Sequence, residues 1–468
     1  MGLKEFREKA ENISEFIEGA IDERKQMLII CHLDADGLTA GSIIGKSIFK
    51  EDGKAIIRAV NDLSPNSIFN LKKQEYDFYI FTDIGMGYVN FLDKELDDRW
   101  LILDHHQSSK EEIEHSRVLN PHEFEIDGGT EISGSGVTYV VSKKMNSSNR
   151  ELSALSVIGA LADRQDQGPS KSLLGINQKV PLKDAKDIGL IKEEKDLIFY
   201  GRETKPIHEA IASTSTPFIP LLTGNYDACL AALTSANFKV KEGERWRTIS
   251  DLSYEEKMKL IEILIPYITK GGAKSDVIEE LFGNVYTMLK EEERSNLRDA
   301  REFGSLLNAC GRSGKAGSGI LICLGDRNEA YSGGEKILQD YKKILAHYLQ
   351  VINTDPKRMQ SGKRIVQIIG DDLVDEKMLG AVSSILSSSL AFKEKMIILR
   401  TKTKENDLKI SARRGEALKD FNLGLLIKET AREIGGTGGG HAAAAGAKIP
   451  LEQYEKFIAE MSKKVGDE

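Results

Sequence analysis

The sequence contains few cysteines and no long apolar segment. Its four cysteines, Cys31, Cys229, Cys310 and Cys323, are far apart and form no CxxC pair. This spacing argues against a zinc knuckle or a disulfide framework and favours a reducing compartment. No apolar run approaches the ~20 residues that a membrane helix needs, and the first residues lack an apolar signal segment. We therefore expect a cytoplasmic protein without a membrane partner.

Aromatic residues are also sparse, and neither sign of charge dominates. Aromatic side chains make up 7% of the 468 residues, which gives only a modest basis for stacking single-stranded bases. The chain has 65 Lys and Arg against 73 Asp and Glu, a net charge of −8. This balance argues against a protein that coats polyanions over its whole surface, but it allows a local basic groove. The length predicts roughly two to four domains.

Short apolar runs alternate with helical patterns in the first part of the chain. The runs at 25–31, 55–60, 77–82 and 100–103 predict buried strands, and the patterns at 3–25, 37–49, 135–144 and 151–162 predict helices. This alternation is typical of an α/β fold with a parallel sheet. In such sheets, ligands bind at the carboxyl ends of the strands.

The second part of the chain predicts a connector and a smaller α/β domain. Residues 191–290 read as a mostly helical insertion, and a helical pattern covers 275–308. We expect a strand at 320–324, a helix at 335–352, further strands at 364–369, 395–400, 408–412 and 444–449, and a glycine-rich turn at 435–441. The predicted domains are therefore 1–190, 191–290 and 291–468.

Acidic and imidazole side chains follow three of the expected strands, and one more Asp ends a helix. The set comprises His32, Asp34, Asp36, Asp83, Asp104, His105, His106 and Asp163. If the three strands are parallel neighbours, these groups meet at one edge of the sheet. Carboxylates gathered there would repel one another without bound cations. A mixed imidazole and carboxylate set suits Mn²⁺ better than Ca²⁺, and a pair of such ions serves phosphoryl transfer.

Each of these segments alone also has a plain structural explanation. An Asp-Gly pair after a strand, as at 36–37, is usually a turn, and adjacent histidines can be ordinary core residues. Their combined occurrence at the ends of strands and helices favours a shared site. Three of the eight histidines belong to it.

The glycine-rich segment that precedes the last expected strand is a candidate phosphate-binding loop. It contains Gly438, Gly439, Gly440 and His441. Glycines let backbone N–H groups approach a phosphate closely, and the histidine can donate to a phosphate oxygen. The alternative is a tight turn between strands with a structural histidine.

Three further side chains are candidates for contacts with a nucleic-acid backbone. Ser411 and Arg413 lie at the end of an expected strand, and Arg312 lies in an expected glycine-rich loop. The alternative for the two arginines is an ordinary solvated charge.

These segments resemble the four motifs of the DHH phosphoesterase superfamily, which is named after the triplet at 104–106. The likeness is strongest to the RecJ-like branch, in particular to archaeal RecJ homologues of the GINS-associated nuclease type. It covers most of the chain and includes the segments 32–38, 307–312 and 438–446.

The resemblance implies the roles of the metal ligands. One ion would be held by His32, Asp34 and Asp83. The other would be held by Asp36, Asp83, His105 and Asp163, with Asp83 bridging the pair, and Asp166 is the alternative to Asp163. The implied ions are two Mn²⁺, with Mg²⁺ as the alternative. His106 would lie beside the substrate phosphate, and Asp104 would orient the histidines.

The resemblance also implies an activity and partners. We expect two α/β domains, with a cleft between them, that hydrolyse phosphodiester bonds from the end of single-stranded DNA in the 5′→3′ direction. The implied setting is DNA replication or repair, with a GINS partner near the replicative helicase. Two alternatives stay open: hydrolysis of RNA, short oligonucleotides or cyclic dinucleotides, and a GINS-bound replication scaffold with little catalysis.

Overall fold

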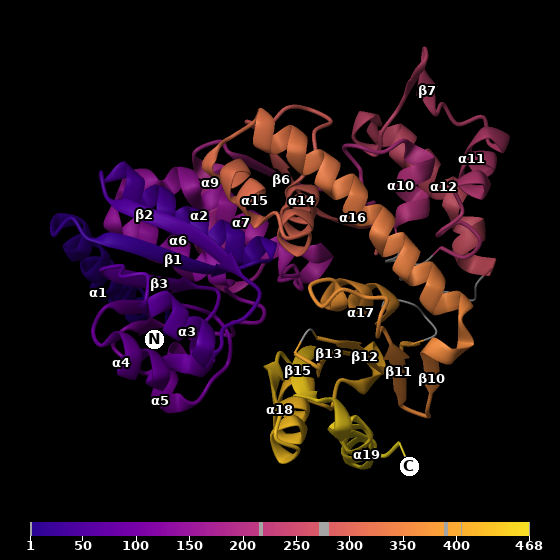
Figure 1. The fold of residues 1–468 in the computed structure, drawn as a ribbon. Helices are drawn as coiled ribbons and strands as arrows, with labels where there is room; N and C mark the ends of the chain where they lie inside the picture. The colour runs from indigo at the N-terminus through magenta and orange to yellow at the C-terminus, as the bar shows by residue number, and fades with distance from the viewer. Residues whose placement is uncertain (1, 215–218, 271–279, 388–391, 404, 468) are drawn as a thin grey trace. The chain divides into compact units, whose positions relative to one another are not determined.

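The computed structural model describes residues 2–214, 219–270, 280–387, 392–403 and 405–467 (Figure 1). The chain divides into two compact units, Met1–Leu338 and Gln339–Glu468. The start of the helical pattern expected at 275–308 lies outside the described residues. Among the helices of the described ranges, none is both long enough and apolar enough to cross a membrane.

Unit 1 is built on a five-stranded sheet in the order β2-β1-β3-β4-β5. Its strands are β1 (Gln26–His32), β2 (Lys54–Val60), β3 (Phe78–Thr82), β4 (Trp100–Leu103) and β5 (Val118–Leu119). Every neighbouring pair is parallel. The predicted parallel sheet is therefore confirmed, and the carboxyl ends of β1, β3 and β4 lie side by side.

Helices cover both faces of this sheet (Figure 1). One face packs on α3 (Pro65–Lys72) and α4 (Val89–Leu96), in a core that includes Tyr79, Phe81 and Trp100. The helices of the other side are α1 (Gly2–Asp22), α2 (Ala35–Lys50), α6 (Gly134–Met145) and α7 (Ser153–Ala162). Nearly every residue of α2 is buried, because α6 and α7 both pack against it.

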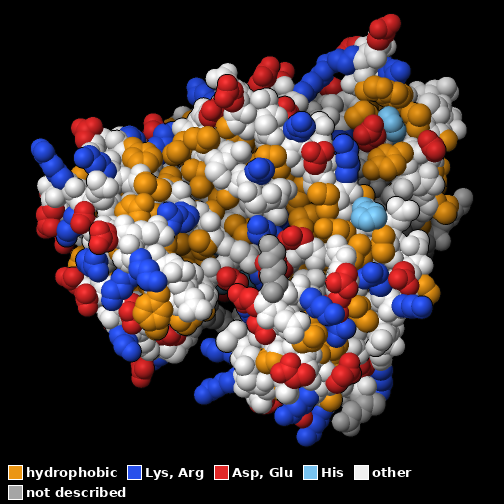
Figure 2. Space-filling view, in the orientation of Figure 1, with side chains coloured by type: hydrophobic (Ala, Val, Ile, Leu, Met, Phe, Trp, Pro, Cys, Tyr) orange, Lys and Arg blue, Asp and Glu red, His pale blue; other side chains and the backbone are white. Residues whose placement is uncertain are grey.

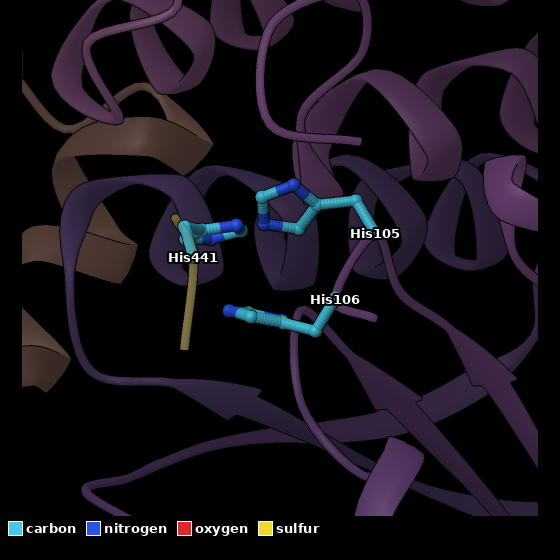
Figure 3. A group of neighbouring side chains, drawn as sticks. All are labelled: His105, His106 and His441. Carbon is cyan, nitrogen blue, oxygen red and sulfur yellow. The ribbon is translucent and has the colours of Figure 1, made fainter. Parts of the chain in front are cut away.

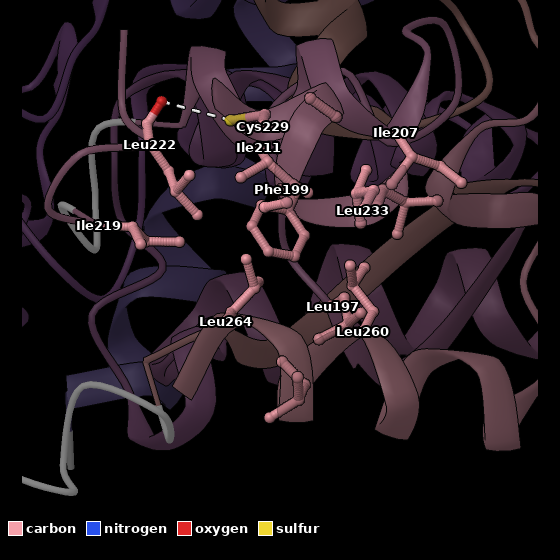
Figure 4. Packing of buried hydrophobic residues seen from close by; sticks show 14 of the residues in the cluster. Leu197, Phe199, Ile207, Ile211, Ile219, Leu222, Cys229, Leu233, Leu260 and Leu264 are labelled. Carbon is pink, nitrogen blue, oxygen red and sulfur yellow. Dashed lines mark hydrogen bonds between the residues drawn. The ribbon is translucent and has the colours of Figure 1, made fainter. Parts of the chain in front are cut away.

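A mostly helical body follows within unit 1. Its helices α10 (Ile207–Ser213), α11 (Tyr226–Ser235) and α12 (Tyr254–Lys270) share a hydrophobic cluster in which Phe199 packs among Ile211, Leu233, Leu260 and Leu264 (Figure 4). The body is closed by an antiparallel pair, β6 (Ile191–Leu197) and β9 (Phe282–Met288). The helical pattern expected over β9 is wrong, because this segment pairs with a strand some ninety residues earlier in the chain.

Three helices follow β9 along the chain: α14 (Ala300–Arg312), α15 (Ala316–Leu324) and α16 (Glu329–Thr354). The strand expected at 320–324 is wrong, since this apolar run forms the end of α15. A short apolar run fits a strand or a buried helix equally well, and α15 is packed against α2 and α14. Arg312 is correspondingly the last residue of α14 and does not lie in a loop.

Unit 2 contains a six-stranded sheet in the order β10-β11-β12-β13-β15-β14. Its strands are β10 (Met359–Ser361), β11 (Ile365–Ile369), β12 (Met396–Lys402), β13 (Asp407–Arg414), β14 (Thr437–Gly440) and β15 (Ala444–Pro450). The helices α18 (Leu423–Glu433) and α19 (Tyr454–Val465) bury one face of this sheet, and α17 (Leu379–Ser387) packs on β12 and β13. The expected second α/β domain is confirmed.

One expectation for unit 2 is wrong in detail. The glycine-rich segment is not a turn, because Gly438–Gly440 belong to the edge strand β14, in which Gly439 pairs with Gly446. The turn comes after the strand, where the N–H of His441 donates to the carbonyl of Ala444 over 2.8 Å.

The surface carries charges of both signs. On the face seen in Figure 2, Lys and Arg side chains are interspersed with Asp and Glu side chains. This agrees with the near balance of 65 Lys and Arg against 73 Asp and Glu in the sequence.

Candidate metal centre

The carboxyl ends of β1, β3 and β4 carry the predicted metal-ligating residues. His32 is the last residue of β1, Asp83 follows β3, and His105 follows β4 by two residues. Asp34 caps helix α2, because its Oδ1 accepts the N–H of Gly37 over 3.1 Å. Asp34 therefore belongs both to the turn before α2 and to the candidate metal site. Its Oδ1 caps the helix, and its Oδ2 faces His32.

His32, Asp34 and Asp83 form a first group of ligand atoms. The Nδ1 of His32 lies 3.0 Å from Oδ2 of Asp34 and 3.7 Å from Oδ2 of Asp83. Burial opposes a charge on His32, but the carboxylate of Asp34 outweighs it and raises the pKa of His32 to about 9. Despite burial, the charge of His32 holds the pKa of Asp34 well below its usual range.

Asp36, His105 and Asp163 form a second group. The Nε2 of His105 lies 3.9 Å from Oδ2 of Asp36 and 3.9 Å from Oδ2 of Asp163. Asp36 is held by two backbone donors at the start of α6, the N–H of Gly134 at 2.7 Å and that of Ser135 at 3.1 Å. In each group, the three candidate ligand atoms lie within 4.8 Å of one another.

Asp83 connects the two groups. Its Oδ2 faces His32, whereas its Oδ1 lies 3.1 Å from Nε2 of His105. The residue is 3% exposed and has a positive φ of 58°, a conformation that side chains rarely adopt. Such strain is typical of functional positions.

The surroundings of Asp83 fit a bound cation. Its Oδ1 is buried and accepts no hydrogen bond of good geometry among the described residues. Burial, reinforced by the charge of Asp36, raises the pKa of Asp83 to about 8. Burial also raises the pKa of Asp163 to about 6, against the opposing charge of His105. A divalent ion would supply the positive charge that these buried carboxylates lack.

His105 is oriented for this role by the loop that precedes α6. Its Nδ1 lies 2.6 Å from the carbonyl of Gly128, so Nδ1 carries a hydrogen and Nε2 faces the carboxylates. Burial opposes a charge on the ring, but the nearby carboxylates of Asp83 and Asp163 raise the pKa of His105 well above its usual value.

Asp104 organises the two adjacent histidines. Its Oδ1 accepts the N–H of His105 at 2.7 Å, the N–H of His106 at 3.2 Å and the Nδ1–H of His106 at 2.7 Å. Figure 3 shows the rings of His105 and His106 side by side, with centroids 4.5 Å apart. Burial disfavours the charged form of His106, but Asp104 reverses this effect and raises its pKa.

The alternative ligand Asp166 has another partner. Both of its hydrogen bonds from Arg301, over 2.7 Å and 3.0 Å, involve its Oδ2. Asp166 is therefore paired with Arg301, and Asp163 is the aspartate that groups with Asp36 and His105.

Two family domain models match parts of the chain. A DHH-CID domain model matches residues 199–282, and a DHHA1 domain model matches residues 361–467. These two matched domains support membership of the DHH superfamily, and the two-domain fold is RecJ-like. The chain is 27% identical over 486 residues to a protein of Methanocaldococcus jannaschii that is described as uncharacterized. The match covers 100% of this chain and 98% of the Methanocaldococcus protein.

Solved structures share the DHH fold at low sequence identity. RecJ from Thermus thermophilus in complex with Mn²⁺ is 15% identical with a TM-score of 0.58, and the match covers 98% of this chain and 55% of RecJ. The present chain thus spans about half of that RecJ. CDC45 from Entamoeba histolytica is 13% identical with a TM-score of 0.61, covering 96% and 98% of the two chains.

The candidate substrate-binding residues fall in both units. Arg312 belongs to unit 1, and its charge helps to lower the pKa of both His32 and Asp34, so it lies near the first group. The DHHA1 domain carries the others. There Ser411 pairs with Gly446, and Arg413 pairs with Ala444, across β13 and β15.

Ser411 and Arg413 also have partners within the DHHA1 domain. The hydroxyl of Ser411 lies 2.9 Å from that of Ser383, and Arg413 donates to the carbonyl of Gly380 over 3.2 Å. Because Gly439 pairs with Gly446, which pairs in turn with Ser411, these three residues lie on the same face of the sheet. The role of these residues in binding stays a prediction.

Two residues that shape the candidate metal centre, Gly159 and Gln165, belong to no motif that the sequence alone singles out. A Cβ on Gly159 would lie 2.4 Å from Oδ1 of Asp36, so only glycine fits at this point of α7. Gln165 is fully buried and donates to Oδ2 of Asp163 over 2.9 Å. Its proximity to Asp163 in the sequence is the one clue that could have singled it out.

Proposed function

We propose that this protein is a metal-dependent exonuclease that hydrolyses phosphodiester bonds from the end of single-stranded DNA, in the 5′→3′ direction. The RecJ-like DHH fold supports the broader class, a phosphoesterase. The observation that carries the proposal is the placement of Asp83, whose two oxygens face two separate groups of ligands.

Two divalent cations fit this donor set, one with His32 and Asp34, and one with Asp36, His105 and Asp163. The solved structures of RecJ with Mn²⁺ and with Mg²⁺ support Mn²⁺ here, with Mg²⁺ as the alternative. When bound, such a pair would activate water and neutralise charge on a phosphodiester.

The chain's own residues would complete the reaction. His106, whose pKa is raised by Asp104, can stabilise the phosphate or protonate the leaving oxygen. Asp104 holds the ring in place and favours its charged form. Gly438, Gly439, Gly440, His441, Arg413 and Ser411 of unit 2, together with Arg312, would bind the nucleic-acid backbone.

A second candidate function is a replication scaffold that binds GINS near the replicative helicase. The similarity to CDC45 favours it, because that structure matches the chain over almost its whole length. Retention of every predicted metal ligand favours catalysis. The two functions are compatible in one protein.

An assay with end-labelled substrates tests the proposed activity. We expect Mn²⁺-dependent release of mononucleotides from 5′-labelled single-stranded DNA, little cleavage of blunt duplex, and no activity in EDTA. Asp83→Ala should abolish hydrolysis, whereas Asp93→Ala, an exposed aspartate paired with His115, should leave it unchanged. Equal rates of hydrolysis for Asp83→Ala and the unmodified protein would contradict the proposal. Faster cleavage of RNA or dinucleotides than of DNA would show that single-stranded DNA is not the preferred substrate.

Separate assays test the role of the DHHA1 domain in DNA binding and the proposed GINS partner. His441→Ala should weaken binding of single-stranded DNA, measured by fluorescence anisotropy, without changing Mn²⁺ binding. Loss of Mn²⁺ in this variant would show that the assignment is wrong. Pull-down with purified GINS tests the scaffold, and retention of GINS by a protein without nuclease activity would favour the second candidate.

A further inference from the structure

Gln165 has a buried side-chain amide that lies beside two candidate metal ligands, Asp163 and His105. It lies where α7 ends, and its own N–H donates to the carbonyl of Ala160 over 3.0 Å. Its Nε2 lies 2.9 Å from Oδ2 of Asp163 and 2.9 Å from the carbonyl of Gly128. The same carbonyl accepts the Nδ1–H of His105 over 2.6 Å. One amide group therefore supports both Asp163 and the acceptor that orients His105.

The orientation of this amide follows from its neighbour Asn177, which is also fully buried. Oδ1 of Asn177 accepts the backbone N–H of Ser133 over 3.4 Å, so the Nδ2 of Asn177 must point the other way. That Nδ2 donates to Oε1 of Gln165 over 2.6 Å. The Nε2 of Gln165 is thereby directed at its two nearest acceptors, and its two hydrogens match them in number.

We propose that Gln165 is a positioning residue for one of the two cations, the ion expected at Asp36, His105 and Asp163. This inference rests on the proposed function. Gln165 reaches Asp163 directly and His105 through Gly128, whereas its hydrogen bonds among the described residues do not extend to the first group of ligands. Residues that orient metal ligands in this way typically change metal affinity 10–100-fold when they are replaced.

The test is a Mn²⁺ titration of the full chain by calorimetry. The unmodified protein should bind two ions. Gln165→Met, which keeps the length of the side chain and removes its polar atoms, should weaken one site about 10–100-fold and spare the other. Activity should recover at high Mn²⁺, because the missing contact affects metal binding and not the chemical step. Gln167→Met is the matched control, since Gln167 is exposed and donates only to the carbonyl of Arg164 among the described residues.

Double variants assign the weakened site. In an Asp34→Ala background, which removes the first site, Gln165→Met should weaken the remaining ion by the same factor. In an Asp163→Ala background it should have almost no further effect. Equal weakening of both sites, or unchanged affinities, would overturn the inference while leaving the proposed function intact.

Two further outcomes separate the inference from its premises. If the unmodified protein binds fewer than two ions, the proposed function and the inference both fail. If Gln165→Met does not fold, as judged by thermal melting in EDTA, Asn177→Ala takes its place, because it removes the bond that orients Gln165. Unchanged Mn²⁺ affinity in Asn177→Ala would then overturn the inference.

Discussion

A methyl group on Gly134 would lie 2.6 Å from Oδ1 of Asp83. No Cβ atom can approach a carboxylate oxygen so closely, and the backbone of Asp83 is already in a rare conformation. The N–H of Gly134 also donates to Asp36. This glycine therefore lets helix α6 reach both carboxylates at once.

Gly134→Ala should displace Asp83 and weaken Mn²⁺ binding at both sites, because Asp83 faces both groups of ligands. We expect a loss of at least about tenfold in affinity and a larger loss of nuclease activity. Calorimetry with Mn²⁺ measures the first. Gly19→Ala in α1 is the control, since a Cβ there meets nothing within 4 Å, and it should leave metal binding unchanged. Undiminished Mn²⁺ affinity in Gly134→Ala would contradict this account of Asp83.

Metal binding should strengthen as the pH rises from about 6 to about 8. In the metal-free protein, burial and Asp36 raise the pKa of Asp83 to about 8, so a cation must displace a proton from it at neutral pH. His32, with a pKa raised to about 9, must also lose a proton. We expect about a tenfold gain in affinity per pH unit for each proton released. Calorimetry in buffers with different ionisation enthalpies counts these protons, and a pH-independent affinity would be inconsistent with the site.

Asp104→Asn should lower the pKa of His106. The substitution removes the negative charge that overcomes the effect of burial on this ring. The charged imidazole then persists only to a lower pH, and the alkaline limb of the activity profile should move in the same direction. NMR titration of the His106 ring measures the shift. Asp93→Asn, beside His115 at 3.0 Å, should leave His106 unaffected.

Glu302→Gln should stabilise the protein at alkaline pH. Burial and the nearby Asp299 raise the pKa of Glu302 from 4.5 to about 7, so its stabilising contribution is complete below pH 4.5 and is lost as the pH rises through 7. Such a rise in pKa corresponds to a loss of about 3 kcal/mol in the free energy of unfolding at alkaline pH. The glutamine keeps partners for the N–H of Glu203 and the hydroxyl of Thr204. Denaturant unfolding in EDTA, at about pH 5 and about pH 8, should show the variant gaining on the unmodified protein only at the higher pH.

The parallel sheet and the predicted ligands could be read from local sequence. The apolar runs that form β1, β3 and β4 are short, buried and directly followed by His or Asp. Parallel pairing then brings their ends together without further information. This explains why Asp83 and His105, which come from different strands, lie 3.1 Å apart as the pattern predicts.

Features that depend on distant partners could not be read in this way. The strand β9 exists because it pairs with β6, and the glycines of β14 are extended because β15 lies beside them. The apolar residues 320–324 are helical because α15 packs on α2 and α14. The roles of Gly134 and Gln165 likewise depend on groups far along the chain, Asp83 and Gly128 respectively, which they reach only after folding.

Anomalous scattering from crystals soaked in Mn²⁺ tests the central claim most directly. Two peaks are expected at the carboxyl edge of the five-stranded sheet. One should be bound by His32, Asp34 and Asp83, and the other by Asp36, Asp83, His105 and Asp163. An empty edge at saturating Mn²⁺, or a peak that Asp83 does not contact, would contradict the claim.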